Sequence, residues 1–177
     1  MIALVRLVVI LLLMAAPVAA QSWYGIQRRP LYRILTVNTT AASTAADTNE
    51  TNLWTYTLPG GTLGRDGQLL RIALRWSTAA NANTKRGRLY FGATAVLDSG
   101  AVAFNGQNLI TTAYVIRTGA TTQTAFSQVL STANQLGSGS APTETLANDI
   151  TVRFSCQNGT AAAADCTFNG VVVEAVN

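Results

Sequence analysis

Apolar and polar residues alternate most clearly over residues 68–77, in the segment QLLRIALRWS. A repeat of two residues is the period of a β-strand that buries one face. The residues at positions 69, 71, 73 and 75 would lie on the opposite face. We therefore predict a strand here, with four apolar side chains filling a core: Leu70, Ile72, Leu74 and Trp76.

Segments rich in β-branched and aromatic residues recur along the rest of the chain. They occupy residues 31–38, 53–59, 87–100, 108–119, 121–131, 150–156 and 166–176. Turn-forming residues separate them at a spacing of about ten residues, which is typical of sandwiches and jelly rolls. We predict an all-β fold, a single jelly-roll-like β-sandwich of about eight strands, preceded by an N-terminal hydrophobic segment.

The first 20 residues have the pattern of a secretory signal peptide. Arg6 precedes an apolar run that begins at Leu7, and small residues at 18–20 precede Gln21. This order of charge, apolar core and small residues predicts cleavage after Ala20. The alternative is an uncleaved membrane anchor, although a spanning helix needs about 20 apolar residues.

Three regions follow from this pattern. Residues 1–20 are a signal peptide or membrane anchor, 21–52 an N-terminal arm with the first strand and a flexible linker, and 53–177 the β-sandwich domain. We expect a protein on a virion surface or exported to the extracellular space or periplasm. Any contact with a membrane would be made through residues 1–20, if they are not cleaved.

The two cysteines are separated by nine residues that include an Asn-Gly pair. If the flanking strands pair as a hairpin, Cys156 and Cys166 would face each other at a Cα separation of about 5.5 Å, which suits a disulfide. An oxidising compartment would favour that bond. The alternative is two free buried thiols. With no histidine and no further cysteine, we expect no metal site.

Charged residues make up 11% of the chain, against about 25% in typical soluble domains. The formal net charge is +4, and Lys85 is the only lysine. Such a weakly charged surface fits an extracellular protein or an assembled particle. The densest basic cluster is too short to predict nucleic-acid binding. We expect it to lie in a loop that contacts a partner, formed by Asn81, Asn83, Lys85, Arg86 and Arg88.

The residue types needed for most catalysis are missing. Without histidine, Ser-His-Asp and Cys-His arrangements are excluded. The carboxylates stand mostly in turn sequences such as Arg65-Asp66-Gly67, where Asp stabilises the backbone turn. We predict a non-enzymatic protein with no catalytic residues and no cofactor. A glycosidase that uses two carboxylates is a remote alternative.

Three aromatic residues on predicted strands could instead stack on sugar rings: Trp54, Trp76 and Tyr90. On this reading the protein would be an exported carbohydrate-binding module. Aromatic residues on strands more often fill the interior of a sandwich or a subunit interface. Both interpretations remain open at the level of sequence.

Several segments resemble small jelly-roll β-sandwich virion proteins of tailed phages and prophages. They are TYTLPGGTL, LLRIALRWSTAANANTKRGRLYFG, AYVIRTGATTQ and the final VVVEAV, so that the resemblance extends from Leu53 to Val176. It implies a decoration, fibre or receptor-binding protein that forms a homo-oligomer, with a trimer favoured. It also implies contacts with other virion proteins or a host-surface glycan. We predict a structural and interaction protein that self-associates.

Overall fold

The computed structural model describes residues 32–131 and 135–176, and within these ranges all regular structure is β. The predicted signal or anchor of residues 1–20 lies outside the described residues. Eleven strands are present: β1 (Tyr32–Asn38), β2 (Ala42–Ser43), β3 (Glu50–Leu58), β4 (Leu69–Thr78), β5 (Lys85–Phe91), β6 (Thr94–Asp98), β7 (Asn108–Gly119), β8 (Thr122–Leu130), β9 (Gln135–Ser140), β10 (Ile150–Asn158) and β11 (Cys166–Val176).

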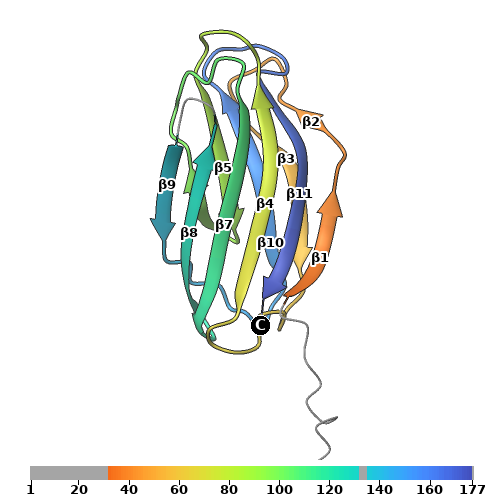
Figure 1. The fold of residues 1–177 in the computed structure, drawn as a ribbon, viewed down its shortest axis with the longest axis vertical. Helices are drawn as coiled ribbons and strands as arrows, with labels where there is room; N and C mark the ends of the chain where they lie inside the picture. The colour runs from red at the N-terminus through yellow and green to blue at the C-terminus, as the bar shows by residue number, and fades with distance from the viewer. Residues whose placement is uncertain (1–31, 132–134, 177) are drawn as a thin grey trace, which may run out of the picture.

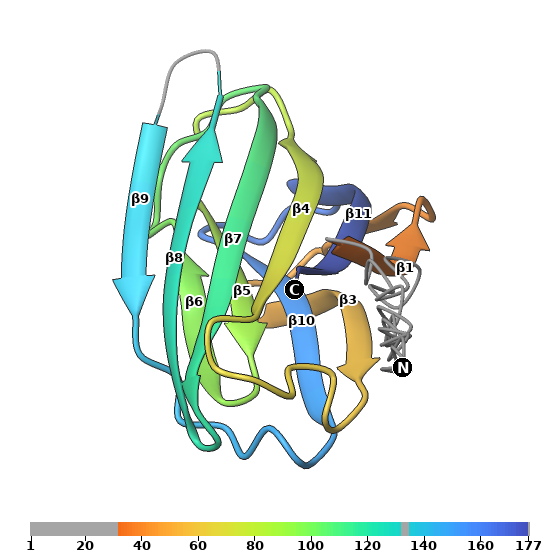
Figure 2. The same cartoon turned by 60° about the horizontal axis from the view of Figure 1, so that its bottom comes forward.

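The strands form two antiparallel sheets that pack face to face (Figures 1 and 2). The large sheet has the order β1-β11-β4-β7-β8-β9, and the short β2 also pairs with β11. The small sheet has the order β3-β10-β5-β6. The predicted all-β sandwich is therefore confirmed.

The connectivity is that of a jelly roll. Four antiparallel pairs are nested along the chain: β1 with β11, β3 with β10, β4 with β7, and β5 with β6. From the outermost pair inward, the pairs lie alternately in the large sheet and in the small sheet. This is the arrangement of a jelly roll, which consists of two Greek keys. The hairpin of β8 and β9 then widens the large sheet beyond the eight strands of the basic roll.

The first strand belongs to the sandwich. β1 pairs with β11 from Tyr32↔Val176 to Asn38↔Val171, and β3 begins at Glu50. The region predicted as an arm and linker before residue 53 thus contributes strands to both sheets. Packing of the sandwich begins at least twenty residues earlier than the boundary placed at residue 53.

The core lies between the sheets. The predicted inward face of β4 is fully buried, and the Trp76 ring contacts Phe104 and Phe154 at centroid distances of 5.6 and 5.5 Å. Because burial of a polar N–H is costly without an acceptor, its indole Nε1 donates a hydrogen bond of 3.0 Å to Thr111 Oγ1. Alternation over residues 68–77 therefore identified a central core strand.

The predicted disulfide between Cys156 and Cys166 is present, with a Cα separation of 6.3 Å. The predicted hairpin around it is wrong. β10 pairs with β3 and β5 in the small sheet, whereas β11 pairs with β1, β2 and β4 in the large sheet. The bond therefore crosses the sandwich and ties the two sheets together near the start of β11.

Candidate functional site

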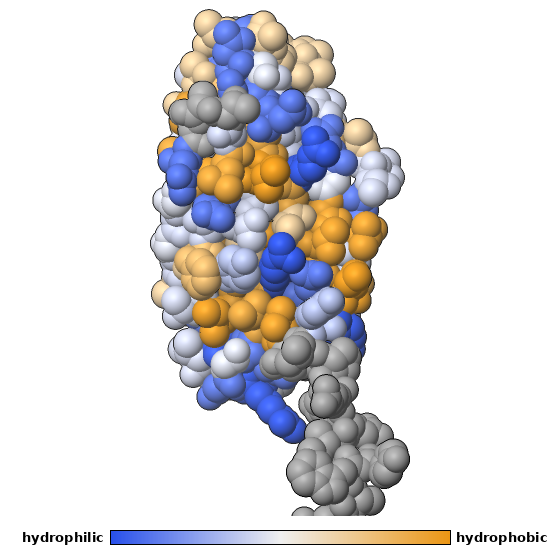
Figure 3. Space-filling model, viewed as in Figure 1, coloured by the Kyte–Doolittle hydropathy of each residue, from blue (hydrophilic) through white to orange (hydrophobic). Residues whose placement is uncertain are grey.

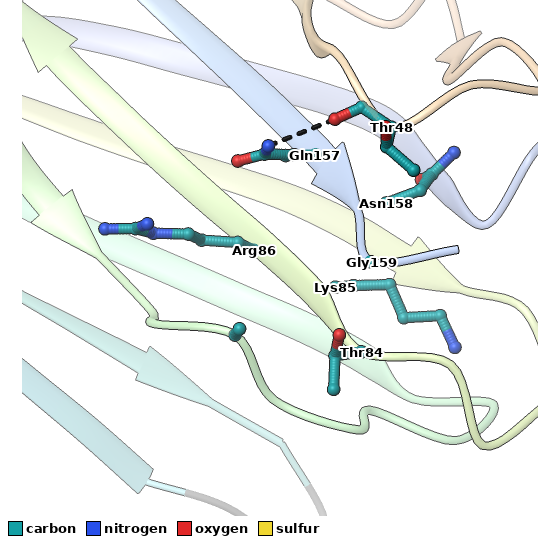
Figure 4. Close-up of a pocket in the computed structure, with 8 residues that line it drawn as sticks. Thr48, Thr84, Lys85, Arg86, Gln157, Asn158 and Gly159 are labelled. Atoms are coloured by element: carbon teal, nitrogen blue, oxygen red, sulfur yellow. Dashed lines mark hydrogen bonds between the residues drawn. The ribbon is translucent and has the colours of Figure 1, made fainter. Parts of the chain in front are cut away.

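The five residues predicted as one partner-contact loop divide between two places. Lys85 is the first residue of β5, and the alternation of that strand sends Lys85 inward while Arg86 and Arg88 point outward. Figure 4 shows Lys85 and Arg86 pointing in opposite directions from the strand. Asn81 and Asn83 lie in the preceding turn, on the side of Lys85. The five residues do not form a single surface.

Lys85 is 0% exposed. Its Nζ donates to Asn81 Oδ1 at 2.5 Å and lies 3.3 to 3.4 Å from the carbonyl oxygens of Ala79, Asn81 and Phe104. The predicted partner contact required the Lys85 ammonium to lie at the surface. Because Lys85 is buried, this part of the prediction is wrong. Lys85 organises the β4–β5 turn from inside and presents no charge to a partner.

Asp165 completes this buried group from the loop before β11. Its carboxylate is 0% exposed and accepts hydrogen bonds from Asn81 Nδ2 at 2.6 Å and Asn83 Nδ2 at 3.0 Å. Burial lowers the pKa of Lys85, and the negative charge of Asp165 opposes that shift. One lysine, one carboxylate and two half-buried carboxamides therefore form a hydrogen-bonded polar cluster at this end of the sandwich.

Arg86 and Arg88 take part in an ion network on the outer face of the small sheet. Arg86 forms a two-pronged pair with Asp98, at 2.7 and 2.5 Å. This hydrogen bonding from Arg86 is the main cause that lowers the pKa of Asp98 to about 2. Arg88 pairs with Glu50 and lies 3.5 Å from Asp98. Both arginines are therefore engaged within the chain.

Tyr90 lies beside this network and is the one partly exposed member of the three predicted stacking aromatics. The Arg153 guanidinium carbon sits 3.7 Å from the centroid of its ring, a cation–π contact. Trp54 and Trp76 are only 6% and 1% exposed. The structure therefore places both tryptophans in the core, where a sugar cannot reach them, and leaves Tyr90 with a guanidinium on one ring face.

A small hollow of about 420 Å³ opens between the ends of β5 and β10 (Figure 4). Thr84, Arg86, Gln157 and Asn158 contribute to its wall. The amide of Gln157 is held by a 3.0 Å hydrogen bond to the Thr48 carbonyl. Its lining is of mixed polarity and contains no aromatic ring.

The outer face of the large sheet has a different character. Figure 3 shows apolar residues gathered in patches over it, with hydrophilic residues between them. The exposed large apolar side chains come from three of its strands. They are Tyr32, Ile34 and Val37 on β1, Ile110 on β7, and Phe126 and Leu130 on β8.

These residues form two groups on either side of the centre of the sheet. We call Tyr32, Ile34 and Val37 the β1 group, and Ile110, Phe126 and Leu130 the β7–β8 group. Phe126 stacks on Tyr114 at a centroid distance of 4.9 Å, and Ile110 is paired with Leu130 across the ladder. Between the two groups lies the ion pair of Arg71 and Glu174, at 2.7 Å.

A shallow hollow of about 360 Å³ separates the groups further along the sheet. Val37 stands on one side and Ile110 on the other, while Ala73, Gly170 and Val172 contribute to the lining. Small side chains on β4 and β11 therefore leave an apolar depression in the middle of an otherwise continuous face.

Two classes of site are not found in the described ranges. Residues 32–131 and 135–176 contain no group of three His, Cys, Asp or Glu residues placed to hold a metal ion. The same residues include no helix of the length and apolarity needed to cross a membrane.

No known family model matches the sequence, and no curated protein is significantly similar to it. Two solved structures that match this chain do so at a TM-score of 0.37. One is the CBM2 module of the evolved Dit of Lactobacillus casei BL23 phage J-1, at 13% identity over 70% of this chain and 68% of that chain. The other is from infectious bursal disease virus, Gx strain, at 14% identity over 82% of this chain and 32% of that chain. The chain thus spans about a third of the length of the second protein.

Proposed function

We propose that this chain is a non-enzymatic structural protein of a virion or cell exterior, and that it self-associates through the outer face of its large sheet. The observation that carries the proposal is the apolar character of that face, with six large side chains exposed. The resemblance of residues 53–176 to phage virion sandwiches supports the same role, with a trimer as the expected assembly.

An outer sheet face of this composition is costly in isolation. An antiparallel sheet with one face in water normally alternates apolar residues inward and polar residues outward. The small sheet follows that rule, since its outer face carries Arg86, Arg88 and Arg153 with their acidic partners. The large sheet departs from it on β1, β7 and β8, and contiguous exposed apolar patches mark interaction sites.

A second copy of this chain is the occupant that we assign to the face. The face offers both a projecting ring, Phe126, at 47% exposed, and the apolar hollow beside Val37 and Ile110. A projection and a hollow at different places on one face can be filled by a second copy of the same face. The trimer is the assembly that the resemblance to phage virion sandwiches implies.

Light scattering coupled to size-exclusion chromatography tests this proposal on the purified chain. We expect the mass of a trimer at micromolar concentration. Phe126→Ser should shift the mass toward the monomer, whereas Thr57→Ser, an exposed control on the small sheet, should not. A monomeric wild type over the micromolar range would overturn the proposal, and so would equal assembly of both variants.

The virion assignment has its own test. Capsid, portal or tail genes beside the coding gene would support it, and a neighbourhood of secretion or cell-wall genes would oppose it. The carbohydrate-binding alternative loses two of its three aromatic residues to the core, because Trp54 and Trp76 are buried. A glycan array with saturable binding that Tyr90→Ala abolishes would restore that alternative.

A further inference from the structure

The buried cluster around Lys85 brings an amine against a carboxamide. Lys85 Nζ lies 2.5 Å from Asn81 Oδ1, so that the amine sits beside the carbonyl group whose carbon, Cγ, is an electrophile. Asn81 lies in the turn between β4 and β5, and Lys85 is the first residue of β5. The amine is thereby held against the oxygen bonded to the carbon that it would attack, and such proximity supplies part of the rate advantage of an intramolecular reaction.

The Asn81 carboxamide is polarised at both of its ends. Its Oδ1 accepts a hydrogen bond from the backbone N–H of Asn83 at 3.0 Å. Its Nδ2 donates to the Asp165 carboxylate at 2.6 Å. A donor on the carbonyl oxygen stabilises the charge that develops there during attack. A carboxyl group on the nitrogen can supply the proton that a departing amine needs.

The cluster is also largely shielded from water. Lys85 and Asp165 are both fully buried, and Asn81 and Asn83 are half-buried. Burial lowers the pKa of Lys85 and so increases the fraction of neutral amine, which is the nucleophilic form. Exclusion of water protects such a site from competing hydrolysis.

We propose that Lys85 and Asn81 become joined by a side-chain amide bond, with Asp165 transferring the protons and the Asn83 N–H stabilising the oxyanion. Every member of this group has a direct contact with the Asn81 carboxamide. Asn83 also donates through its side chain to Asp165 and so helps to position the carboxylate.

The step balances without an oxidant, a reductant or a cofactor. As Nζ moves from Oδ1 towards Cγ, the Lys85 ammonium gives up one proton to Asp165, the carboxylate whose charge acts on it, and the neutral Nζ attacks Asn81 Cγ. The Nζ–Cγ bond forms and Oδ1 takes up the negative charge. Asp165 then protonates Nδ2, the Cγ–Nδ2 bond breaks to release ammonia, and the second Nζ proton passes to that ammonia. The products are one secondary amide and one ammonium ion, and Asp165 returns to its carboxylate form.

Peptide mapping of the purified, reduced and alkylated wild-type protein tests this proposal directly. Trypsin cannot cut after an acylated lysine, so the peptide of residues 76–86 should remain uncut at Lys85 and weigh one ammonia less than its sequence mass. Fragmentation should produce no backbone ions between Asn81 and Lys85. A local measurement is required because cyclisation of an N-terminal Gln21 would remove the same mass elsewhere.

Variants test whether the loss of ammonia requires the amine of Lys85 and the carboxylate of Asp165. Lys85→Met keeps the aliphatic chain without the amine, and Asp165→Asn keeps the shape of the side chain without the base. Both should return the peptide to its full mass at position 81. Ala82→Ser is the matched control, since it changes an exposed position of the same turn, and it should still form the bond. Circular dichroism of each variant identifies those that fold.

Full-mass peptide with complete cleavage at Lys85, in folded wild-type protein after prolonged incubation at neutral and mildly alkaline pH, would overturn the proposal. So would an ammonia loss at residues 81–85 that persists in Lys85→Met, because that result would indicate cyclisation of Asn81 on the backbone. These outcomes are independent of assembly and do not depend on the proposed function.

Discussion

Gly87 on β5 lies directly against the indole ring of Trp76 on β4. A Cβ atom added at Gly87 would come within 2.9 Å of two atoms of that ring, closer than side chains pack in protein interiors. Gly87 points inward between Lys85 and Leu89, both fully buried. The small sheet therefore approaches the large sheet closely at this point because one position has no side chain.

We expect Gly87→Ala to destabilise the protein by about 1–3 kcal/mol, because a methyl group overpacks the core against a ring that cannot move freely. Urea denaturation measures the free energy of unfolding. The matched control is Gly137→Ala on β9, where the nearest atom to the new Cβ would be 3.8 Å away. Equal stability of the two variants would contradict the close packing of Gly87 on Trp76.

The hydrogen bond from Trp76 Nε1 to Thr111 Oγ1 should also contribute measurably to the free energy of unfolding. Thr111→Val keeps the shape of the side chain but leaves the buried N–H of Trp76 without its acceptor, at a cost of about 1–3 kcal/mol. Thr112→Val on the other face of β7 is the control and should change the free energy of unfolding by well under that amount. A null effect of Thr111→Val would mean that the indole finds another acceptor.

The disulfide should stabilise the sandwich because it links strands of different sheets. Replacing both Cys156 and Cys166 with Ala should lower the free energy of unfolding by about 2–4 kcal/mol. Denaturation with and without reductant provides the comparison. Reductant should lower the midpoint of the wild type and leave the double variant unchanged. An unchanged midpoint in wild type whose two thiols have been titrated as free would refute the stabilising role.

Stability should fall in acid through the network on the small sheet. The pKa of Asp98 is lowered from its ordinary value of 3.8 to about 2, chiefly by hydrogen bonding from Arg86. A carboxylate with a lowered folded pKa stabilises the protein above the unfolded pKa, and that contribution is lost as the pH falls through the folded pKa.

The free energy of unfolding should therefore decline between pH 3.8 and about 2. Asp98→Asn should reduce the slope, with a loss at neutral pH of about 0–1 kcal/mol because the pair is partly exposed. Part of the dependence of the free energy of unfolding on pH should remain in Asp98→Asn, because the pKa of Glu50 is also lowered. Burial raises the pKa of that carboxyl, but hydrogen bonds from Ser155 and Tyr90 and the nearby arginines lower it overall. A slope unchanged in Asp98→Asn would contradict this account.

The pattern of the sequence predicted the parts of the fold that depend on local alternation. β4 followed directly from period-two burial over residues 68–77. In contrast, β9 was missed, because the segment QLGSGS has the composition of a flexible linker. Backbone hydrogen bonding to β8 holds it as an edge strand, and composition does not report that pairing.

The environment of Lys85 could not be predicted from neighbouring residues. A lysine after Asn-Ala-Asn-Thr and before Arg is normally solvated. Its burial depends on Phe104, whose carbonyl it reaches, and on Asp165, whose carboxylate binds Asn81 and Asn83 from another loop. The disulfide was predicted correctly, but from a hairpin that the structure does not contain. Its position between sheets required knowing that β10 and β11 pair with different neighbours.

The nested pairing of strands has a consequence for how the chain is made. Since β1 pairs with β11, the first described strand acquires its partner only when the last one has left the ribosome. Pairings of such long sequence separation fold slowly, and the bond from Cys156 must also wait for Cys166. The large sheet therefore cannot be completed before β11 is made, and a chain that has not closed its sandwich can still be threaded across a membrane before it folds and oxidises on the far side.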